Sequence, residues 1–200
     1  MNILIISGSA RINSQSRRIS DVVKLRLNSI YRIEADIFDL VGNPLPLWDE
    51  LVGANSEDWS KLLDPVRSKM RSADAFVIVV PEWGGMVPPS LKNLFLLSTQ
   101  HELGHKPALI VSISSTSNGS YPVSELRMSS YKNTKILYLP EHIIVRNVEE
   151  VLYEIGGSRE SEYILKRLDN NLGLLKAYAE AMVHVRSSKL VDIHAYPYGM

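Results

Sequence analysis

The apolar positions of the chain form short continuous runs, separated by longer stretches in which apolar residues recur every three or four positions. Four strong runs and one weaker run are present: Ile3–Ile6, Ala75–Val80, Ala108–Ile113, Lys135–Leu139 and, more weakly, Glu34–Leu40. Unbroken apolar runs of this length are typical of strands that are buried on both faces. The sequence therefore predicts the five strands of a parallel sheet.

The intervening stretches have helical periodicity, because their apolar residues fall on one face of a helix. Helices are predicted around Ile19–Ile30, Trp59–Met70, Pro88–Leu97, Pro122–Lys132 and Glu160–Arg186. Strands that alternate with helices predict a doubly wound α/β sheet with helices on both faces. In the tail after Ser187, the alternation of Val191 and Ile193 predicts a small edge strand or an oligomer contact.

Composition narrows the function classes. The 200 residues are 45% hydrophobic, which suits a single domain over residues 1–200. The 22 basic and 22 acidic residues cancel, so we expect neither nucleic acid nor a membrane as partner. The chain has no cysteine, so any redox chemistry belongs to a bound cofactor. The N-terminus shows no targeting segment, and we expect a cytoplasmic protein.

Three loops follow the carboxyl ends of predicted strands: Ser7–Ser16, Pro81–Ser90 and Ser112–Tyr121. In a doubly wound sheet, ligands bind beyond these ends, where the strand order switches. We therefore expect the three loops to meet at one site, although they are far apart in the sequence.

The first loop has the composition of a phosphate site. Ser9, Ser14 and Ser16 provide hydroxyls, Arg11 provides a positive charge, and a helix begins directly after them. Hydroxyls, a guanidinium and the N-terminus of a helix together hold a phosphate without a metal. The loop lacks the three-glycine dinucleotide fingerprint and the Walker lysine, so a mononucleotide fits it better than a pyrophosphate. The alternative interpretation of Ser14 or Ser16 is ordinary helix capping.

The second and third loops suit a planar ring. Trp83 can cover a ring face, and Gly84-Gly85 lets the backbone approach it closely. The polar third loop, Ser112–Ser120, can hydrogen-bond the far edge of the same ring. Each loop also has a plain alternative, in which Trp83 belongs to the core, the glycines form a turn, and the third loop is a solvent loop.

Four segments together resemble one family over most of residues 2–150. The segments GSARINSQSR, DLVGNPLPLWDE, PEWGGMVPPSLKN and ELR are similar to those of the NADPH-dependent FMN reductases, flavodoxin-like flavoproteins that include quinone, azo-dye and chromate reductases. The resemblance implies a flavodoxin-like fold, in which the first loop holds the FMN phosphate, the second lines the isoalloxazine and the third borders its pyrimidine edge. Trp83 and Gly84 stand where the family usually has tyrosine and asparagine.

The cofactor-binding residues expected from the loops and the resemblance are Ser9, Arg11, Ser14, Gln15, Ser16, Pro81, Glu82, Trp83, Gly84, Gly85, Ser115, Ser117, Asn118 and Gly119. The resemblance implies a ping-pong reaction in which NADPH or NADH reduces FMN, and FMN reduces a small acceptor such as a flavin, quinone, azo compound or metal oxyanion. No side chain is expected to act as an acid or base. We also expect a homodimer or homotetramer.

The sequence leaves two other functions open. The chain could bind FMN as an electron carrier or sensor without turnover of its own. Carriers usually present an acidic face to their partners, and the balanced charge of this chain argues mildly against that function. His101-Glu102-Leu103-Gly104-His105 also matches the zinc-hydrolase pattern H-E-x-x-H, with Glu125 as a conceivable third ligand. That pattern needs a continuous helix through both histidines, whereas Gly104 favours the end of a helix, so no metal ligand is assigned.

Overall fold

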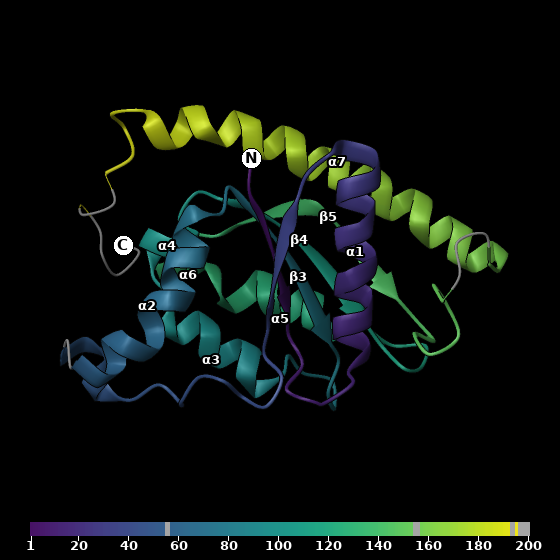
Figure 1. The fold of residues 1–200 in the computed structure, drawn as a ribbon, viewed down its shortest axis with the longest axis horizontal. Helices are drawn as coiled ribbons and strands as arrows, with labels where there is room; N and C mark the ends of the chain where they lie inside the picture. Colours follow the sequence, from purple (N-terminus) through teal and green to yellow (C-terminus); the bar gives the residue numbers. More distant parts are fainter. Residues whose placement is uncertain (55–56, 154–156, 193–194, 196–200) are drawn as a thin grey trace.

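The structure is a computed structural model that describes residues 1–54, 57–153, 157–192 and 195. Its centre is one five-stranded sheet with the order β2-β1-β3-β4-β5, in which all neighbouring strands are parallel. The strands are β1 (Ile3–Ser7), β2 (Ala35–Asp39), β3 (Ala75–Pro81), β4 (Pro107–Ile113) and β5 (Leu137–Val145). This is the flavodoxin-like order, with its switch point between β1 and β3. The predicted fold class is confirmed (Figure 1).

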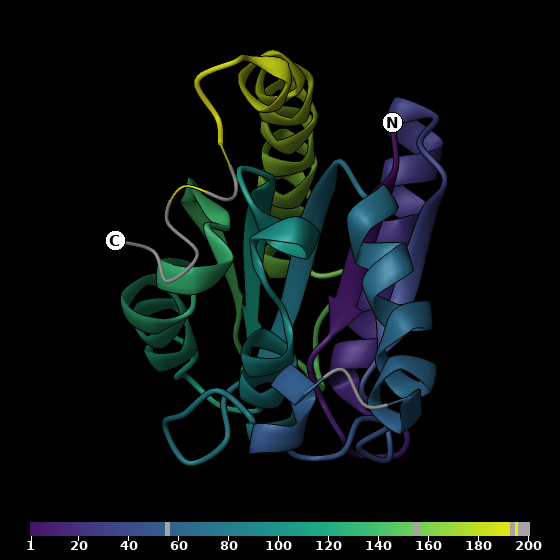
Figure 2. The same ribbon diagram turned by 90° about the vertical axis from the view of Figure 1, so that its left-hand side faces the viewer.

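Helices cover both faces of the sheet, and α1 and α5 lie on opposite sides of the strands in Figure 2. The helices are α1 (Gln15–Tyr31), α2 (Glu57–Ser72), α3 (Pro89–Leu97), α4 (Gln100–Leu103), α5 (Tyr121–Ser129), α6 (Tyr131–Thr134) and α7 (Arg159–Ser187), together with the short 3-10 helix η1 (Glu50–Ala54). In the part of the chain that the structure describes, no helix has both the length and the apolarity needed to cross a membrane.

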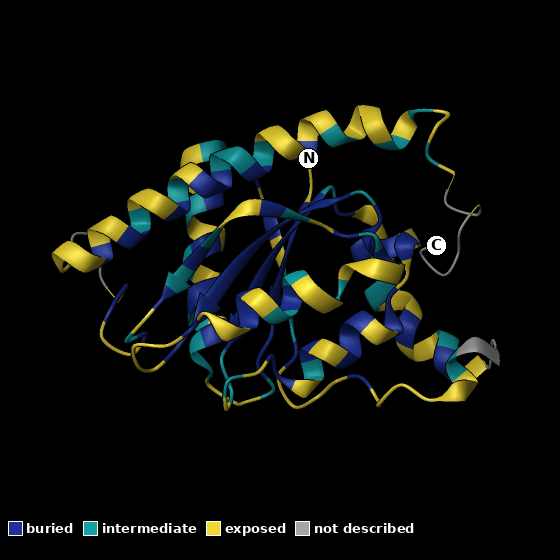
Figure 3. Ribbon diagram, turned by 180° about the vertical axis from the view of Figure 1, so that it is seen from behind, coloured by how far each residue is buried: buried dark blue, intermediate teal, exposed yellow. Residues whose placement is uncertain are grey.

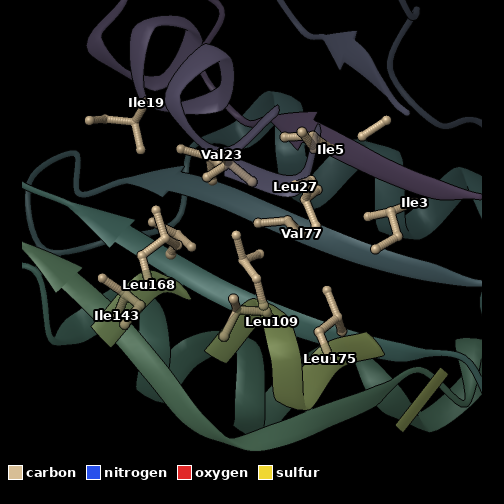
Figure 4. Packing of buried hydrophobic residues seen from close by; sticks show 14 of the residues in the cluster. Ile3, Ile5, Ile19, Val23, Leu27, Val77, Leu109, Ile143, Leu168 and Leu175 are labelled. Atoms are coloured by element: carbon tan, nitrogen blue, oxygen red, sulfur yellow. The ribbon is translucent and has the colours of Figure 1, made fainter. Parts of the chain in front are cut away.

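The first hydrophobic cluster packs α1 and α7 against one face of the sheet. Side chains of α1 and α7 point toward the strands in Figure 4; among them are Ile19, Val23, Leu27, Leu168 and Leu175, all less than 3% exposed. The α1 residues are those whose spacing predicted a helix. Burying an aliphatic side chain of this size stabilises the fold by about 1.5–3 kcal/mol, so this stripe fixes how α1, and with it the first loop, is seated.

The second cluster lies on the opposite face, where α2, α3, α4 and α5 cover the strands. Residues from these helices, including Leu63, Met70, Leu91 and Leu126, belong to one buried cluster with Phe76 of β3, which has no exposed surface. All seven residues of β3 and of β4 are buried. The strands lie between two helical layers whose outer faces are exposed (Figure 3), which explains why their runs are continuously apolar.

The last strand differs from its prediction at both ends, and it begins at Leu137 rather than Lys135. The last strand does not end at Leu139 but continues through Pro140 to Val145. Proline is tolerated there because β5 is an edge strand and its pairing with β4 shifts register between Ala108 and Ile110. The extension carries the chain to the same edge of the sheet as the three loops.

The helix predicted over Pro122–Lys132 is two helices, α5 and α6, which meet at Ser130. The hydroxyl of Ser130 binds the carbonyl of Leu126 at 2.8 Å and lies 2.6 Å from the Tyr138 hydroxyl. Such bonding from serine to the preceding turn competes with helix continuation. The strand alternative predicted for Val191 and Ile193 falls on a tail in which 193–194 and 196–200 lie outside the described residues.

Candidate functional site

The first loop lies against β3 at the switch point. The N–H of Gly8 donates to the carbonyl oxygen of Val79 at 2.8 Å, and a Cβ at position 8 would stand 2.9 Å from that oxygen and 3.0 Å from Leu91. Real Cβ atoms avoid such distances, so glycine is required for this close approach. The loop is thereby seated at the carboxyl edge of the two central strands.

Hydroxyl groups gather where this loop enters α1. Ser14 caps the helix by accepting from the N–H of Arg17 at 3.2 Å, and the Ser9 hydroxyl accepts from the N–H of Arg11 at 3.2 Å. Ser16, in the first turn of α1, is 1% exposed, and its hydroxyl has no hydrogen-bond partner among the described residues. Buried hydroxyls nearly always have a partner, so Ser16 marks a place where a ligand is expected.

The arginines near the loop divide into engaged and available groups. Arg17 pairs with Asp21 and Asp39, and its hydrogen bond to Asp21 raises its pKa. Arg18 donates to backbone carbonyls of the segment after β5. Arg11 is exposed and makes no ion pair within the described residues. It is therefore the arginine of this loop that can supply its charge to an anion.

The second loop folds as a tight turn. Trp83 and Met86 exchange two backbone hydrogen bonds of 3.0 Å, and Gly84 and Gly85 have φ of 56° and 77°. Two positive φ angles at the central positions define a type I′ turn, which favours glycine and asparagine. Gly84, which stands where the family usually has asparagine, therefore preserves the backbone conformation of this turn.

A buttress joins the second and third loops. The carboxylate of Glu82 accepts from the N–H of Gly119 at 2.7 Å, and the N–H of Glu82 donates to the carbonyl of Ile113 at 3.0 Å. Gly119 has φ of 107°, and a Cβ there would lie 2.6 Å from the Cγ2 of Ile144. The third loop is thus held in place by an interaction that its own polar sequence did not reveal.

These elements border one polar cleft. Of the predicted site residues, it is lined by Ser9, Arg11, Ser14, Gln15, Ser16, Pro81, Glu82, Trp83 and Ser115. Gly84, Gly85, Ser117, Asn118 and Gly119 do not line it. Asn13, Ile113, Ser114, Val148 and Glu149 line it as well, and the sequence analysis missed them. Val148 and Glu149 reach it because β5 continues beyond Pro140, which the short predicted strand concealed.

The cleft fits a phosphorylated flavin by the chemistry of its donors. The exposed Arg11, the buried Ser16 hydroxyl and the first turn of α1 all belong to the lining of the cleft, and they are the groups that a phosphate requires. Trp83, which is partly buried, and Pro81 line the same cleft and offer flat apolar surface. A larger groove, about 440 Å³, lies between α3, α5 and α6, with Phe95, Leu96 and Leu126 in its walls. It contains none of the predicted site residues.

The segment His101–His105, which matches the zinc-hydrolase pattern, does not have the continuous helix that a zinc site of this kind needs. Helix α4 has four residues and ends at Gly104, where a Cβ would lie 2.4 Å from the carbonyl oxygen of Gln100. Glu102 is 1% exposed; it completes a capping box with Thr99 and pairs with Arg71 at 2.9 Å. The described residues include no group of three or more histidine, aspartate or glutamate side chains suited to a metal. His105 lies beyond the helix with φ of 56°.

Comparison with known proteins supports the same interpretation. The family model of the NADPH-dependent FMN reductases matches residues 1–150. An FMN-dependent NADPH-azoreductase of Staphylococcus saprophyticus is 31% identical over 126 residues, which cover 62% of this chain and 66% of that protein, just under two thirds. An NADPH azoreductase of a Bacillus species is 19% identical over 156 residues, 78% of this chain and 83% of that protein.

Solved structures share the fold. A flavoenzyme NAD(P)H:(acceptor) oxidoreductase, FerB, of Paracoccus denitrificans superposes with a TM-score of 0.70 at 19% identity, over 92% of this chain and 97% of that one. An oxidoreductase of Corynebacterium diphtheriae also superposes with a TM-score of 0.70, at 15% identity, over 90% and 97% of the two chains.

Proposed function

Since the chain belongs to the NADPH-dependent FMN reductase family, we propose that it is an NAD(P)H-dependent oxidoreductase that binds FMN in the cleft of the three loops and reduces a small acceptor. The azoreductase names of its relatives support a flavin, quinone, azo compound or metal oxyanion as that acceptor.

One observation carries the proposal: a buried serine hydroxyl and an exposed arginine, neither with a side-chain partner among the described residues, lie together at the start of a helix. Ser16 and Arg11 both line the cleft, and Ser14 caps the same helix. A phosphate bound there would accept hydrogen bonds from these groups and from the first N–H groups of α1. No metal is needed to balance its charge, because the guanidinium and the helix N-terminus provide it.

The remaining residues orient the ring rather than react with it. When bound, FMN supplies the redox chemistry, taking a hydride from the reduced nicotinamide and passing two electrons to the acceptor. Trp83 and Pro81 offer flat apolar surface, and the Glu82–Gly119 hydrogen bond fixes the spacing between the second and third loops. We assign no side chain as an acid or a base.

Because all three loops border one cleft, we propose that nicotinamide and acceptor occupy the same opening in turn, which gives ping-pong kinetics. Initial rates measured at several fixed acceptor concentrations test this order. Parallel double-reciprocal lines are expected, and intersecting lines would show that both substrates bind together.

The first test is an absorption spectrum of the purified protein after FMN is added and unbound flavin is removed by desalting. We expect flavin bands that stay with the protein and bleach when NADPH is added without oxygen. Bands that NADPH does not bleach would indicate a carrier or sensor. A protein that retains no flavin would contradict the proposal.

A substitution tests the phosphate end of the site. Arg11→Ala is expected to weaken FMN binding by about 1–3 kcal/mol, the usual cost of losing a hydrogen bond to a charged group, without change in the circular dichroism spectrum. Lys24→Ala, which removes an exposed charge farther along α1, is the matched control and should leave FMN affinity unchanged. Equal affinities for all three proteins would mean that the phosphate binds elsewhere.

We further propose a homodimer or homotetramer and a cytoplasmic location. Exposed apolar side chains on α7, including Tyr163, Val183 and Val185, support a contact between copies. A second copy would also supply walls for a bound flavin that a single edge of the sheet would not provide. Analytical ultracentrifugation at micromolar concentration tests the first, and a monomer would refute it. Cell fractionation tests the second.

A further inference from the structure

We propose that Arg18 is a positioning residue that holds the segment after β5 against the first turn of α1 and so shapes the phosphate end of the cleft. The consequence is specificity: the site selects a phosphorylated flavin over the same flavin without phosphate. This inference rests on the proposed binding of FMN and extends it to a residue that does not line the cleft.

Arg18 makes contacts in four directions. Its Nη1 donates to the carbonyl of Leu152 at 2.9 Å, and its Nη2 donates to the carbonyl of Val148. Its Nε donates to the Oε1 of Gln15 at 2.6 Å, and its guanidinium stacks on Tyr153 at 4.0 Å from the ring centre. One side chain of α1 therefore binds both ends of the segment 148–153, which is 130 or more positions away in sequence.

The segment 147–153 contains strained backbone, so contacts that hold it in place matter for its conformation. Asn147 and Leu152 have φ of 45° and 62°, a conformation that costs non-glycine residues about 1 kcal/mol or more each. The N–H groups of Asn147 and Val148 donate to Thr116 and Ser114 of the third loop at 3.1 and 3.0 Å. Arg18 adds the connection on the other side, between the segment and the first loop.

Two residues of the fastened segment are walls of the cleft. Val148 is 2% exposed and Glu149 is exposed, and both line the cleft that Ser14 and Ser16 also line. Since Glu149 carries a formal negative charge, its distance from a bound phosphate affects the affinity for that phosphate. The hydrogen bond from Arg18 to the carbonyl of Val148 holds the backbone next to Glu149 and so helps to position its carboxylate.

The charge of Arg18 is also left without a carboxylate. Arg17 pairs with Asp21 and Asp39, and Arg26 pairs with Asp169, whereas Arg18 makes no ion pair among the described residues and donates to neutral groups. Burial lowers its pKa, yet arginine stays protonated. An unneutralised guanidinium thus lies behind the first turn of α1, where it favours an anion in the cleft.

Gln15, which the sequence predicted as a cofactor ligand, takes part in this fastening. Its Oε1 accepts from Arg18, and its Nε2 donates to the Tyr153 hydroxyl at 3.3 Å. Both ends of its amide are therefore engaged by protein groups. We infer that Gln15 supports the wall of the cleft, while Ser9, Ser14 and Ser16 contact the phosphate.

The test compares dissociation constants for FMN and riboflavin, which differ by the phosphate alone, by fluorescence titration of the apoprotein. Arg18→Ala is expected to lower the ratio of FMN affinity to riboflavin affinity by about tenfold, equivalent to one lost charged hydrogen bond. The matched control is Arg26→Ala, which also removes an α1 arginine that anchors a distant segment. Arg26→Ala should leave the ratio unchanged. Any partial unfolding that it causes would lower the affinities for FMN and for riboflavin equally.

Arg18→Lys keeps the charge but has a single ammonium group in place of the planar guanidinium with its several N–H donors. It should therefore restore the ratio in part. If Arg18→Ala does not fold, the ratio of FMN affinity to riboflavin affinity in Arg18→Lys tests the inference in its place, and it should lie below the wild-type ratio. Amide hydrogen exchange of residues 147–153 should accelerate in the Arg18 variants and not in Arg26→Ala. An unchanged ratio in both Arg18 variants would overturn the inference. A wild-type protein that binds neither flavin would instead refute the proposed function.

Discussion

Gly119 offers a direct test of how the third loop is seated. It combines two separate demands for glycine, a φ of 107° and a position where a Cβ would lie 2.6 Å from the Cγ2 of Ile144. Gly42 makes only the first demand, since its φ is 71° and a Cβ there would have no heavy atom of the described residues within 4 Å. The pair therefore separates backbone strain from steric crowding.

Gly42→Ala is expected to lower the free energy of unfolding by about 1–2 kcal/mol, the cost of placing an L-residue at positive φ. Gly119→Ala should lose that amount and about 1–3 kcal/mol more, because the added methyl overpacks against β5. The total for Gly119→Ala is therefore about 2–5 kcal/mol. The hydrogen bond from the N–H of Gly119 to Glu82 should weaken as well, so FMN affinity is also expected to fall.

The assay is urea denaturation of both variants and wild type at one pH, followed by circular dichroism, with FMN titration of the folded proteins. Matching slopes with different midpoints would locate the change in stability rather than in compactness. Equal losses for the two variants would refute the reasoning, because the contact with Ile144 would then add nothing. Loss of stability without loss of FMN affinity would show that the Glu82–Gly119 buttress does not shape the site.

Three further changes probe contacts away from the cleft. Glu102→Gln should cost about 1–3 kcal/mol in urea unfolding, because it removes the charge of a buried carboxylate that pairs with the half-exposed Arg71. It should leave NADPH oxidation intact, and loss of activity at full stability would revive the zinc hypothesis. Burial lowers the pKa of Lys106 to about 8 from 10.5, so the unfolded chain binds more protons between these values and the free energy of unfolding should rise with pH there. Lys106→Met should remove that rise, and an unchanged slope in paired denaturation series at about pH 8 and 10, which lie within this range, would contradict it. Asn93→Ala removes the side chain that accepts from the N–H of Trp48 at 2.8 Å; a thermal melt should show a loss of about 1–3 kcal/mol, and an unchanged midpoint would count against this anchor.

Local chemistry explains what could be predicted from the sequence. The apolar runs of β1, β3 and β4 were found because a strand buried on both faces has no polar positions to interrupt it. The first loop was expected to line the cleft because its hydroxyls, its cation and the start of a helix are neighbours in the chain, and these are the groups that phosphate binding draws on. The turn at Gly84 and Gly85, which was the plain alternative for the second loop, was likewise indicated by the residue type, since glycine adopts the required positive φ angles without strain.

Contacts between distant residues could not be predicted. The continuation of β5 through Pro140 depends on its place at the edge of the sheet, whereas a proline taken in isolation predicts the end of a strand. Glu82 was expected at the flavin, yet its carboxylate also holds Gly119, 37 positions away. Nothing near Glu82 in the sequence indicates that partner.

By itself, then, the sequence determined the parallel sheet, the covering helices and the polar loop that begins α1, because these follow from periodicity and from groups adjacent in the chain. The tertiary structure decided which side chains stand around the cleft and which support it. Val148 and Glu149 became its wall, Arg18 and Gln15 became their fastening, and Glu102 became a buried cap rather than a catalytic base. The physical reason is that a hydrogen bond depends on distance and direction in space, and the fold sets both only after remote segments have packed together.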